Sequence, residues 1–329
     1  MIPPEVAFQR FLYDRRARGE NKYAHILGRI AVEELSSDHL YRWFSDWMNR
    51  QLSDIGVSST GGVSLPPLHF EMVRVQNKKP CAHVFETGDY GFILMSQPIF
   101  DEMLNLSRRA VKKNWAFMTL QIAPSANDEQ IAQLLLLIQF SFVNSHEYSH
   151  LVRQHLADHP PDALALGESL RQVQEFDADG YAIFHGLTYF FHGGGRQIAA
   201  DLLRISSQNV LENSLIECFL LSTMLQFCVR WAGKIKIESD LSTEHPPPPM
   251  RIQQAILFME MWCREVGQMP TPWMTDGTLR RHFDMADSLF APAMKAGWSQ
   301  QLAWLKSKDS EDYRDSIRRG IDRLRTGKD

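Results

Sequence analysis

The residues of this sequence best suited to chemistry are two histidines and a glutamate in the pattern HExxH, namely His146, Glu147 and His150. On a helix, positions i and i+4 lie on one face about 6 Å apart, so both histidines can reach one metal ion. Glu147 lies one residue further round, close enough to accept a proton from a water molecule bound to that ion. The pattern predicts metal-assisted hydrolysis, provided that the chain supplies a third ligand.

The third ligand can be sought in two places. A metzincin pattern would need a third histidine with a glycine before it, but the tenth residue after the first histidine is Leu156 and no glycine precedes it. We interpret His155 and His159 as non-ligands. A second helix offers carboxylates instead, because Glu175 and Asp179 share a face at positions i and i+4. One of them can bind zinc while the other accepts a ring N–H from a ligating histidine.

Two structural explanations compete with a metal site. An HExxH pattern arises by chance in roughly a few per cent of chains of this length, and its histidines would then only hydrogen-bond inside a buried helix. Glu175, Asp177 and Asp179 could likewise form an exposed acidic helix face. The metal interpretation is favoured because ionisable groups at the end of so apolar a helix are costly to bury unless they are paired or bind metal.

Two helices must position these side chains. The run from Asp128 to His155 is predicted to be one helix, since Asp128 stands where an N-cap would and no Pro or Gly interrupts the run. The second helix is predicted over about residues 168–191 and ends at three consecutive glycines. Near that end, His185 and His192 are expected to be capping or surface histidines.

Around these helices the sequence predicts a mostly helical α+β fold with a small sheet. Residues 5 to about 55 have helical spacing and predict an N-terminal helical layer. Three short strands, antiparallel in part, are predicted between residues 68 and 96. If Tyr90–Ser96 is an edge strand, it could bind an extended peptide by strand addition. Further helices are predicted within residues 98–114, 197–232, 250–266 and the C-terminal tail.

Four motifs in order give the sequence a family resemblance. HEYSHLVRQH (146–155), EFDADGYA (175–182) and STEHPPPPMRI (242–252), preceded by CAHVFETGDYGFILMSQPIFDEML (81–104), make the chain similar to the HtpX / CAAX-prenyl-protease family of gluzincin metallopeptidases. The resemblance covers about residues 70–260. It departs from the family pattern in a shorter spacer between the first two motifs, nearer that of ImmA/IrrE-type peptidases, in the missing transmembrane helices, and in Glu244 inserted before His245.

The resemblance implies a zinc endopeptidase with one zinc ion per chain. It implies that His146, His150 and Glu175 bind the metal, that Glu147 is the general base and that Asp179 is an outer carboxylate. It also implies that His245 or Arg251 stabilises the oxyanion or braces the site. The corresponding domain organisation is an N-terminal helical extension (1–60), a metallopeptidase core with the HExxH helix (61–266) and a C-terminal helical extension (267–329), and these extensions are expected to restrict access to the cleft.

Composition sets the remaining expectations. The chain of 329 residues is 44% hydrophobic and 22% charged, which is ordinary for a globular protein, and its net charge is -4. Basic residues form only short clusters, so no nucleic-acid partner is expected. The four cysteines, Cys81, Cys218, Cys228 and Cys263, show no CxxC spacing and are interpreted as reduced thiols. No segment suits a signal peptide or a membrane span, so a soluble cytoplasmic protein without membrane insertion is predicted.

The predicted function is therefore that of a soluble zinc-dependent endopeptidase acting on a peptide or protein substrate through a metal-activated water with Glu147 as general base. One alternative is a dedicated regulatory or phage-defence-type protease, or a non-catalytic zinc-stabilised regulator, that acts on a single partner protein. A further alternative is a helical interaction protein whose HExxH pattern is accidental, and it predicts that no metal binds.

Overall fold

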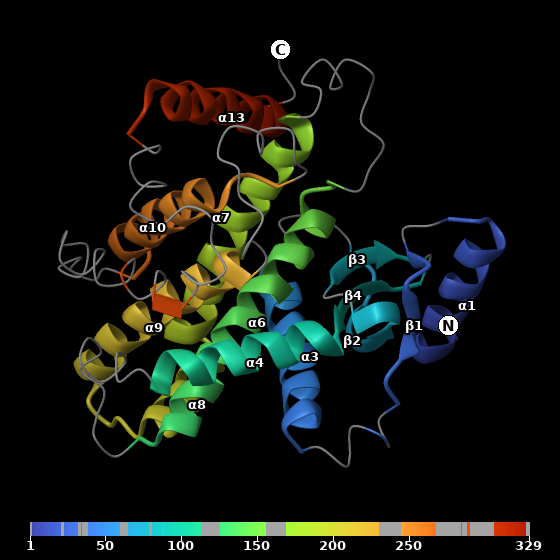
Figure 1. Cartoon of the computed structure of the whole chain (residues 1–329), viewed down its shortest axis with the longest axis horizontal. Coiled ribbons are helices and arrows are strands. Elements are labelled where there is room, and N and C mark those ends of the chain that lie inside the picture. Colours follow the sequence, from blue (N-terminus) through green and yellow to red (C-terminus); the bar gives the residue numbers. More distant parts are fainter. Residues whose placement is uncertain are drawn as a thin grey trace. The chain divides into compact units, whose positions relative to one another are not determined.

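The computed structural model (Figure 1) describes residues 2–20, 23–31, 34, 39–59, 65–78, 81–87, 89–112, 126–155, 169–229, 245–267, 284, 288–289 and 306–326. The chain divides into two compact units. Unit 1 comprises Met1–Asn105 and Phe140–Leu156, and unit 2 comprises Leu106–Gln139 and Ala157–Asp329. His159 and the predicted boundary between residues 60 and 61 lie outside the described residues. The predicted three-part division of the chain stays a prediction.

Unit 1 combines helices with the sheet, and unit 2 is helical in the part that is described. The elements of unit 1 are α1 (Pro4–Ala17), β1 (Ile26–Arg29), α3 (His39–Ser59), β2 (Leu68–Val75), the 3-10 turn η2 (Gln76–Lys78), β3 (Ala82–Glu86), β4 (Gly91–Ser96) and the first part of α4 (Gln97–Lys112). Those of unit 2 are α7 (Ser169–His192), α8 (Gly195–Leu203), α9 (Gln208–Val229), α10 (Pro248–Glu265) and α13 (Lys308–Thr326). Helix α6 (Asp128–Val152) contributes residues to both units. The prediction of a mostly helical α+β fold is confirmed.

The sheet has four strands in the order β1-β2-β4-β3. Strands β2 and β4 are parallel, while β1 with β2 and β3 with β4 are antiparallel. The three predicted strands are confirmed. The prediction that Tyr90–Ser96 could be an edge is wrong, because β4 is fully buried and hydrogen-bonded to a strand on each side. A continuous run of apolar residues is typical of such a central strand, which is covered on both faces.

The prediction of an all-helical N-terminal segment is also wrong, because residues 26–29 form β1. This strand pairs with the end of β2, more than forty residues later, with a register shift between Ile26 and Gly28. The backbone N–H of Ile30 continues the pairing by donating to the carbonyl of Met72 at 2.9 Å. Four residues carry too little periodicity to distinguish a strand from a helix, and the pairing with a distant segment decides the structure here.

Aromatic side chains form the core on the face of the sheet that α1 covers. Phe11 stacks on Phe85 with ring centroids 3.8 Å apart, and Phe8 packs on both Phe85 and Phe92. A second aromatic group joins Phe44 of α3 to other helices of the same unit, with Phe100 and Phe140 as its neighbours. Ring contacts therefore join α1 to the sheet, and a separate set joins α3, α4 and α6.

Side-chain hydrogen bonds define where helix α6 begins and hold it against α3. Its N-cap is Asn127, whose side chain accepts the N–H of Gln130 at 2.8 Å, so the prediction of Asp128 as N-cap is wrong by one residue. In turn, the N–H of Asn127 donates to Oε1 of Gln130, which completes a capping box. Farther along, buried Asn144 donates to Gln51 Oε1 of α3 at 3.0 Å. This buried bond lies two residues before His146 and fixes the rotation of the helix that carries it.

In unit 2, close backbone approaches bring helices α10 and α13 onto α7. A Cβ at Gly180 would lie 2.6 Å from the Phe258 ring of α10, and one at Gly320 of α13 would lie 2.5 Å from Val173. Phe176 of α7 also packs against Tyr313 of α13. The described part of the C-terminal extension therefore supports the first half of α7.

No helix among the described residues is long and apolar enough to cross a membrane.

The two histidines near the end of α7 differ in environment. His192 is its last residue and is exposed, as predicted, but His185 is half-buried inside the helix and neither caps its end nor lies on the surface. Its ring packs against Tyr181 with centroids 4.2 Å apart. Burial disfavours the charged imidazolium and lowers the pKa of His185 to about 4 from 6.5.

We expect His185 to make the fold sensitive to acid. The unfolded chain takes up a proton here below pH 6.5 and the folded chain only near pH 4, so stability is lost as the pH falls between these values. From pH 7 to pH 5 the wild type should lose about 2 kcal/mol more than His185→Gln. Urea unfolding of both proteins with a metal chelator present measures the difference. Parallel losses in the two proteins would contradict the assignment.

Candidate metal centre

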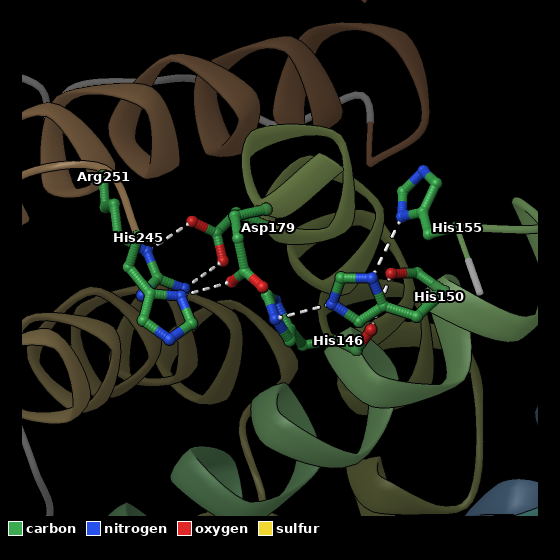
Figure 2. Close-up of polar contacts among 8 residues, drawn as sticks. His146, His150, His155, Asp179, His245 and Arg251 are labelled. Carbon is green, nitrogen blue, oxygen red and sulfur yellow. Dashed lines mark hydrogen bonds and ion pairs between the residues drawn. The ribbon is translucent and has the colours of Figure 1, made fainter. Parts of the chain in front are cut away.

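The C-terminal half of α6 presents two imidazoles to each other (Figure 2). His146 and His150 lie one turn apart, with their rings in a T-shaped contact and their Nε2 atoms 3.2 Å from one another. Two nitrogens bound at 2.0–2.1 Å to one tetrahedral zinc ion are separated by about 3.3 Å. The spacing therefore fits two ligands of a single ion. Glu147, 9% exposed, is the residue between them in the pattern.

The other ring nitrogen of His150 is also engaged. Its Nδ1 lies 3.0 Å from Nδ1 of His155, and Figure 2 shows His150 between the other two histidines. If Nε2 of His150 binds a cation, the ring proton must reside on Nδ1, which then donates to His155. Ligating histidines characteristically donate their second ring N–H in this way.

The backbone at the end of α6 places His155 beside the ring of His150. Gln154 has a left-handed backbone with φ 56°, its N–H donates to Leu151, and the N–H of His155 donates to His150 at 2.9 Å. These bonds make a Schellman cap, which stops the helix and turns the chain back over its last turn. That His155 is not a ligand stays a prediction, and its hydrogen bond to His150 was not predicted. The only sequence signal for it was a third histidine five residues after His150.

The acidic residues of α7 are not an exposed face, so that explanation is wrong. Asp177 and Asp179 are 3% and 0% exposed, and only 14% of the Glu175 side chain is accessible. Glu175 Oε2 lies 2.9 Å from Nδ1 of His245, whose side chain is 40% exposed. This contact orients the carboxylate of Glu175 through one of its oxygens.

Asp179 is paired with Arg251 in a buried, two-pronged ion pair. Arg251 donates from Nε to Oδ2 at 2.7 Å and from a terminal nitrogen to Oδ1 at 2.6 Å. The guanidinium also lies 4.5 Å from the centre of the Phe227 ring. This arrangement braces α7 against α10. The predicted role of Asp179 as acceptor for a ligating histidine stays a prediction.

The Pro-rich segment before α10 sets the position of Arg251. Pro247 is the N-cap, and Pro248 and Pro249 occupy the first turn, where a missing N–H costs nothing. Arg251 follows in that turn and donates its backbone N–H to the carbonyl of Pro247 at 3.1 Å. The close approach at Gly180, next to Asp179, completes the geometry of the pair.

Two groups among the described residues have side chains that could hold a metal ion. One consists of His146, His150 and Glu175, the predicted ligands, and the other of His25, Cys81 and His83. Two members of the first group have close polar contacts: a ring nitrogen of His150 with His155, and a carboxylate oxygen of Glu175 with His245. The second group was not predicted, because its members are far apart in the sequence.

Comparisons of the chain with protein-family models, with curated proteins and with solved structures found no match. The functional assignment therefore depends on the side chains described here and on the order of the motifs.

The buried Asp179–Arg251 pair yields a stability prediction. Removing one partner leaves an uncompensated buried charge, so Asp179→Ala or Arg251→Ala should each lower the free energy of unfolding by about 3–5 kcal/mol. The double variant Asp179→Leu/Arg251→Met should lose clearly less, because neither charge then remains. Urea unfolding measures these differences.

A matched control is available in the same unit. Arg196 and Glu212 form a partly exposed pair at 2.9 Å, and Glu212→Gln should cost less than about 1 kcal/mol. Losses of equal size at the two pairs, or a double variant as unstable as both single variants combined, would contradict the proposed brace.

Proposed function

We propose that the protein is a zinc-dependent peptidase of the gluzincin type in which His146, His150 and Glu175 bind the metal ion. The observation that carries the proposal is the pair of Nε2 atoms of His146 and His150, which face each other at a spacing suited to one tetrahedral ion. The order of the HExxH, ExxxD and His-Pro motifs along the chain supports the same class.

The donor set favours zinc over hard cations. Two imidazoles and one carboxylate are the protein ligands of many catalytic zinc sites, whereas Mg²⁺ and Ca²⁺ prefer sites made of oxygen atoms. When bound by three protein ligands, zinc lowers the pKa of its water to about 7 and polarises a carbonyl group. The remaining steps fall to side chains of the chain itself.

Glu147 is the proposed proton carrier. Its carboxylate would accept a proton from the attacking water and return it to the nitrogen of the departing amine. Its position directly after His146 keeps it beside the proposed ligands without making it one of them. The limited exposure of Glu147 reduces competition from solvent for this proton.

Two further residues would hold the ligands in orientation. With an ion on Nε2, His155 would accept the Nδ1 proton of His150, and His245 would fix one oxygen of Glu175. Such outer partners typically change metal affinity or activity by about 10–100-fold when they are removed. We assign this orienting role to His245, which also remains the candidate residue for stabilising the oxyanion. Arg251 acts instead as a brace through its ion pair with Asp179.

The test is hydrolysis of an unfolded protein and of a mixed peptide library by the zinc-loaded full chain. We expect cleavage by the wild type and a 10²–10⁴-fold lower rate in Glu147→Gln, because general acid–base catalysis contributes about that much. Glu147→Gln keeps the shape of the side chain, and equal zinc content and circular dichroism confirm that the variant is intact. Arg314→Gln, on a half-buried residue of α13 that contacts Gln253, serves as the unchanged control.

Unchanged cleavage in Glu147→Gln would contradict the assigned mechanism. A zinc-loaded wild type that leaves every unfolded substrate intact would contradict a general peptidase and favour a protease dedicated to one partner, or a regulator that uses zinc only for stability.

A further inference from the structure

Three side chains with nitrogen or sulfur donor atoms meet within unit 1, apart from the HExxH helix. His25 directly precedes β1, Cys81 directly precedes β3, and His83 is the second residue of β3. One donor atom from each of them lies within 4.8 Å of the donor atoms of the other two. Since residues 25 and 83 are 58 positions apart, this arrangement is a product of the fold.

We infer that His25, Cys81 and His83 form a second metal site, which takes a thiophilic transition-metal ion such as Zn²⁺. The Nε2 atoms of His25 and His83 are 3.4 Å apart, close to the separation of about 3.3 Å expected for two nitrogens on one tetrahedral zinc ion. Cys81 adds a sulfur, which such ions bind as thiolate and which Mg²⁺ and Ca²⁺ do not favour.

The strand geometry points Cys81 and His83 in the same direction. Residues two apart on a strand share a face, and the next member of this series, Phe85, belongs to the aromatic core under α1. The backbone at Cys81 is fixed by two bonds to Ser96 of β4, because Cys81 N–H donates to Ser96 Oγ and Ser96 N–H donates to the Cys81 carbonyl, each at 2.9 Å. The thiol is thus held by the sheet.

His25 is fixed in a similar way from the other side. Its carbonyl accepts the N–H of Gln76 at 2.8 Å, which extends the pairing of β1 with β2 by one residue. Tyr23, two residues earlier, makes an edge contact with the His83 ring at 5.8 Å between centroids. All three proposed ligands are therefore positioned by backbone pairing or ring packing, which reduces the entropy lost when an ion binds.

The surroundings suit an ion that stabilises the fold. Cys81 is 8% exposed and the two histidines are half-buried, so an ion could enter yet would be largely shielded from water. Strands β1 and β3 form opposite edges of the sheet. An ion held by His25 and His83 would link the segment leading into one edge strand to the other edge strand. This inference is independent of the proposed peptidase activity.

Cobalt substitution tests the site, because Co²⁺ replaces zinc and reports a sulfur ligand by an intense near-ultraviolet charge-transfer band. The metal-free full chain would be titrated with Co²⁺. We expect this thiolate band in the wild type, its loss in Cys81→Ser, and its weakening in His25→Gln, which leaves the thiol in place. Added Zn²⁺ should abolish the band by displacement.

Two controls separate this site from the HExxH group and from other thiols. The group of His146, His150 and Glu175 contains no sulfur, so His146→Ala/His150→Ala should keep the band. Cys263→Ala, on a buried cysteine of α10, should also keep it. Circular dichroism must show that each variant is folded. A folded wild type without the band, a band that persists in Cys81→Ser, or its loss in His146→Ala/His150→Ala would overturn the inference.

Discussion

Ionisable side chains buried at the ends of apolar helices must find partners, and this constraint shapes the described parts of both units. Along the last turns of α6 and its cap, the imidazoles of His146, His150 and His155 form a continuous series of contacts. In α7 Glu175 meets His245, and Asp179 meets Arg251. Each contact offsets the cost of removing a polar or charged group from water. The same contacts hold Nε2 of His146 and Nε2 of His150 facing each other, at the spacing that the proposed ion requires.

The supporting structure explains why these side chains hold their positions. Buried Asn144 and Gln51 set the rotation of α6, and the Schellman cap at Gln154 determines where the helix stops. On α7, the close approach at Gly180 allows α10 to bring Arg251 to Asp179. Metal sites depend on such outer contacts for the orientation of their ligands. The proposed peptidase chemistry therefore depends on packing several residues away from the reacting atoms.

Much of the fold follows from local sequence patterns. Helices α6 and α7, strands β2, β3 and β4, and the group of candidate ligands were all predicted from periodicity, turn residues and motif spacing. The errors arose where contacts between distant segments of the chain determine the structure. Strand β1 exists through pairing with β2, and the position of β4 between β2 and β3 depends on pairing with segments before it in the chain. The position of His155 depends on the left-handed backbone of Gln154, which the sequence does not indicate. The group of His25, Cys81 and His83 forms only when the sheet folds.

The central claim is that His146, His150 and Glu175 hold one zinc ion, and zinc content per chain tests it most directly. The measurement uses the Cys81→Ser background, so that the second proposed site does not contribute, with dialysis against a weak chelator before elemental analysis. We predict one zinc per chain in this background and in the added Glu147→Gln variant, and loss of zinc with Glu175→Ala. A background protein without zinc after reconstitution, or full zinc content in Glu175→Ala, would contradict the account.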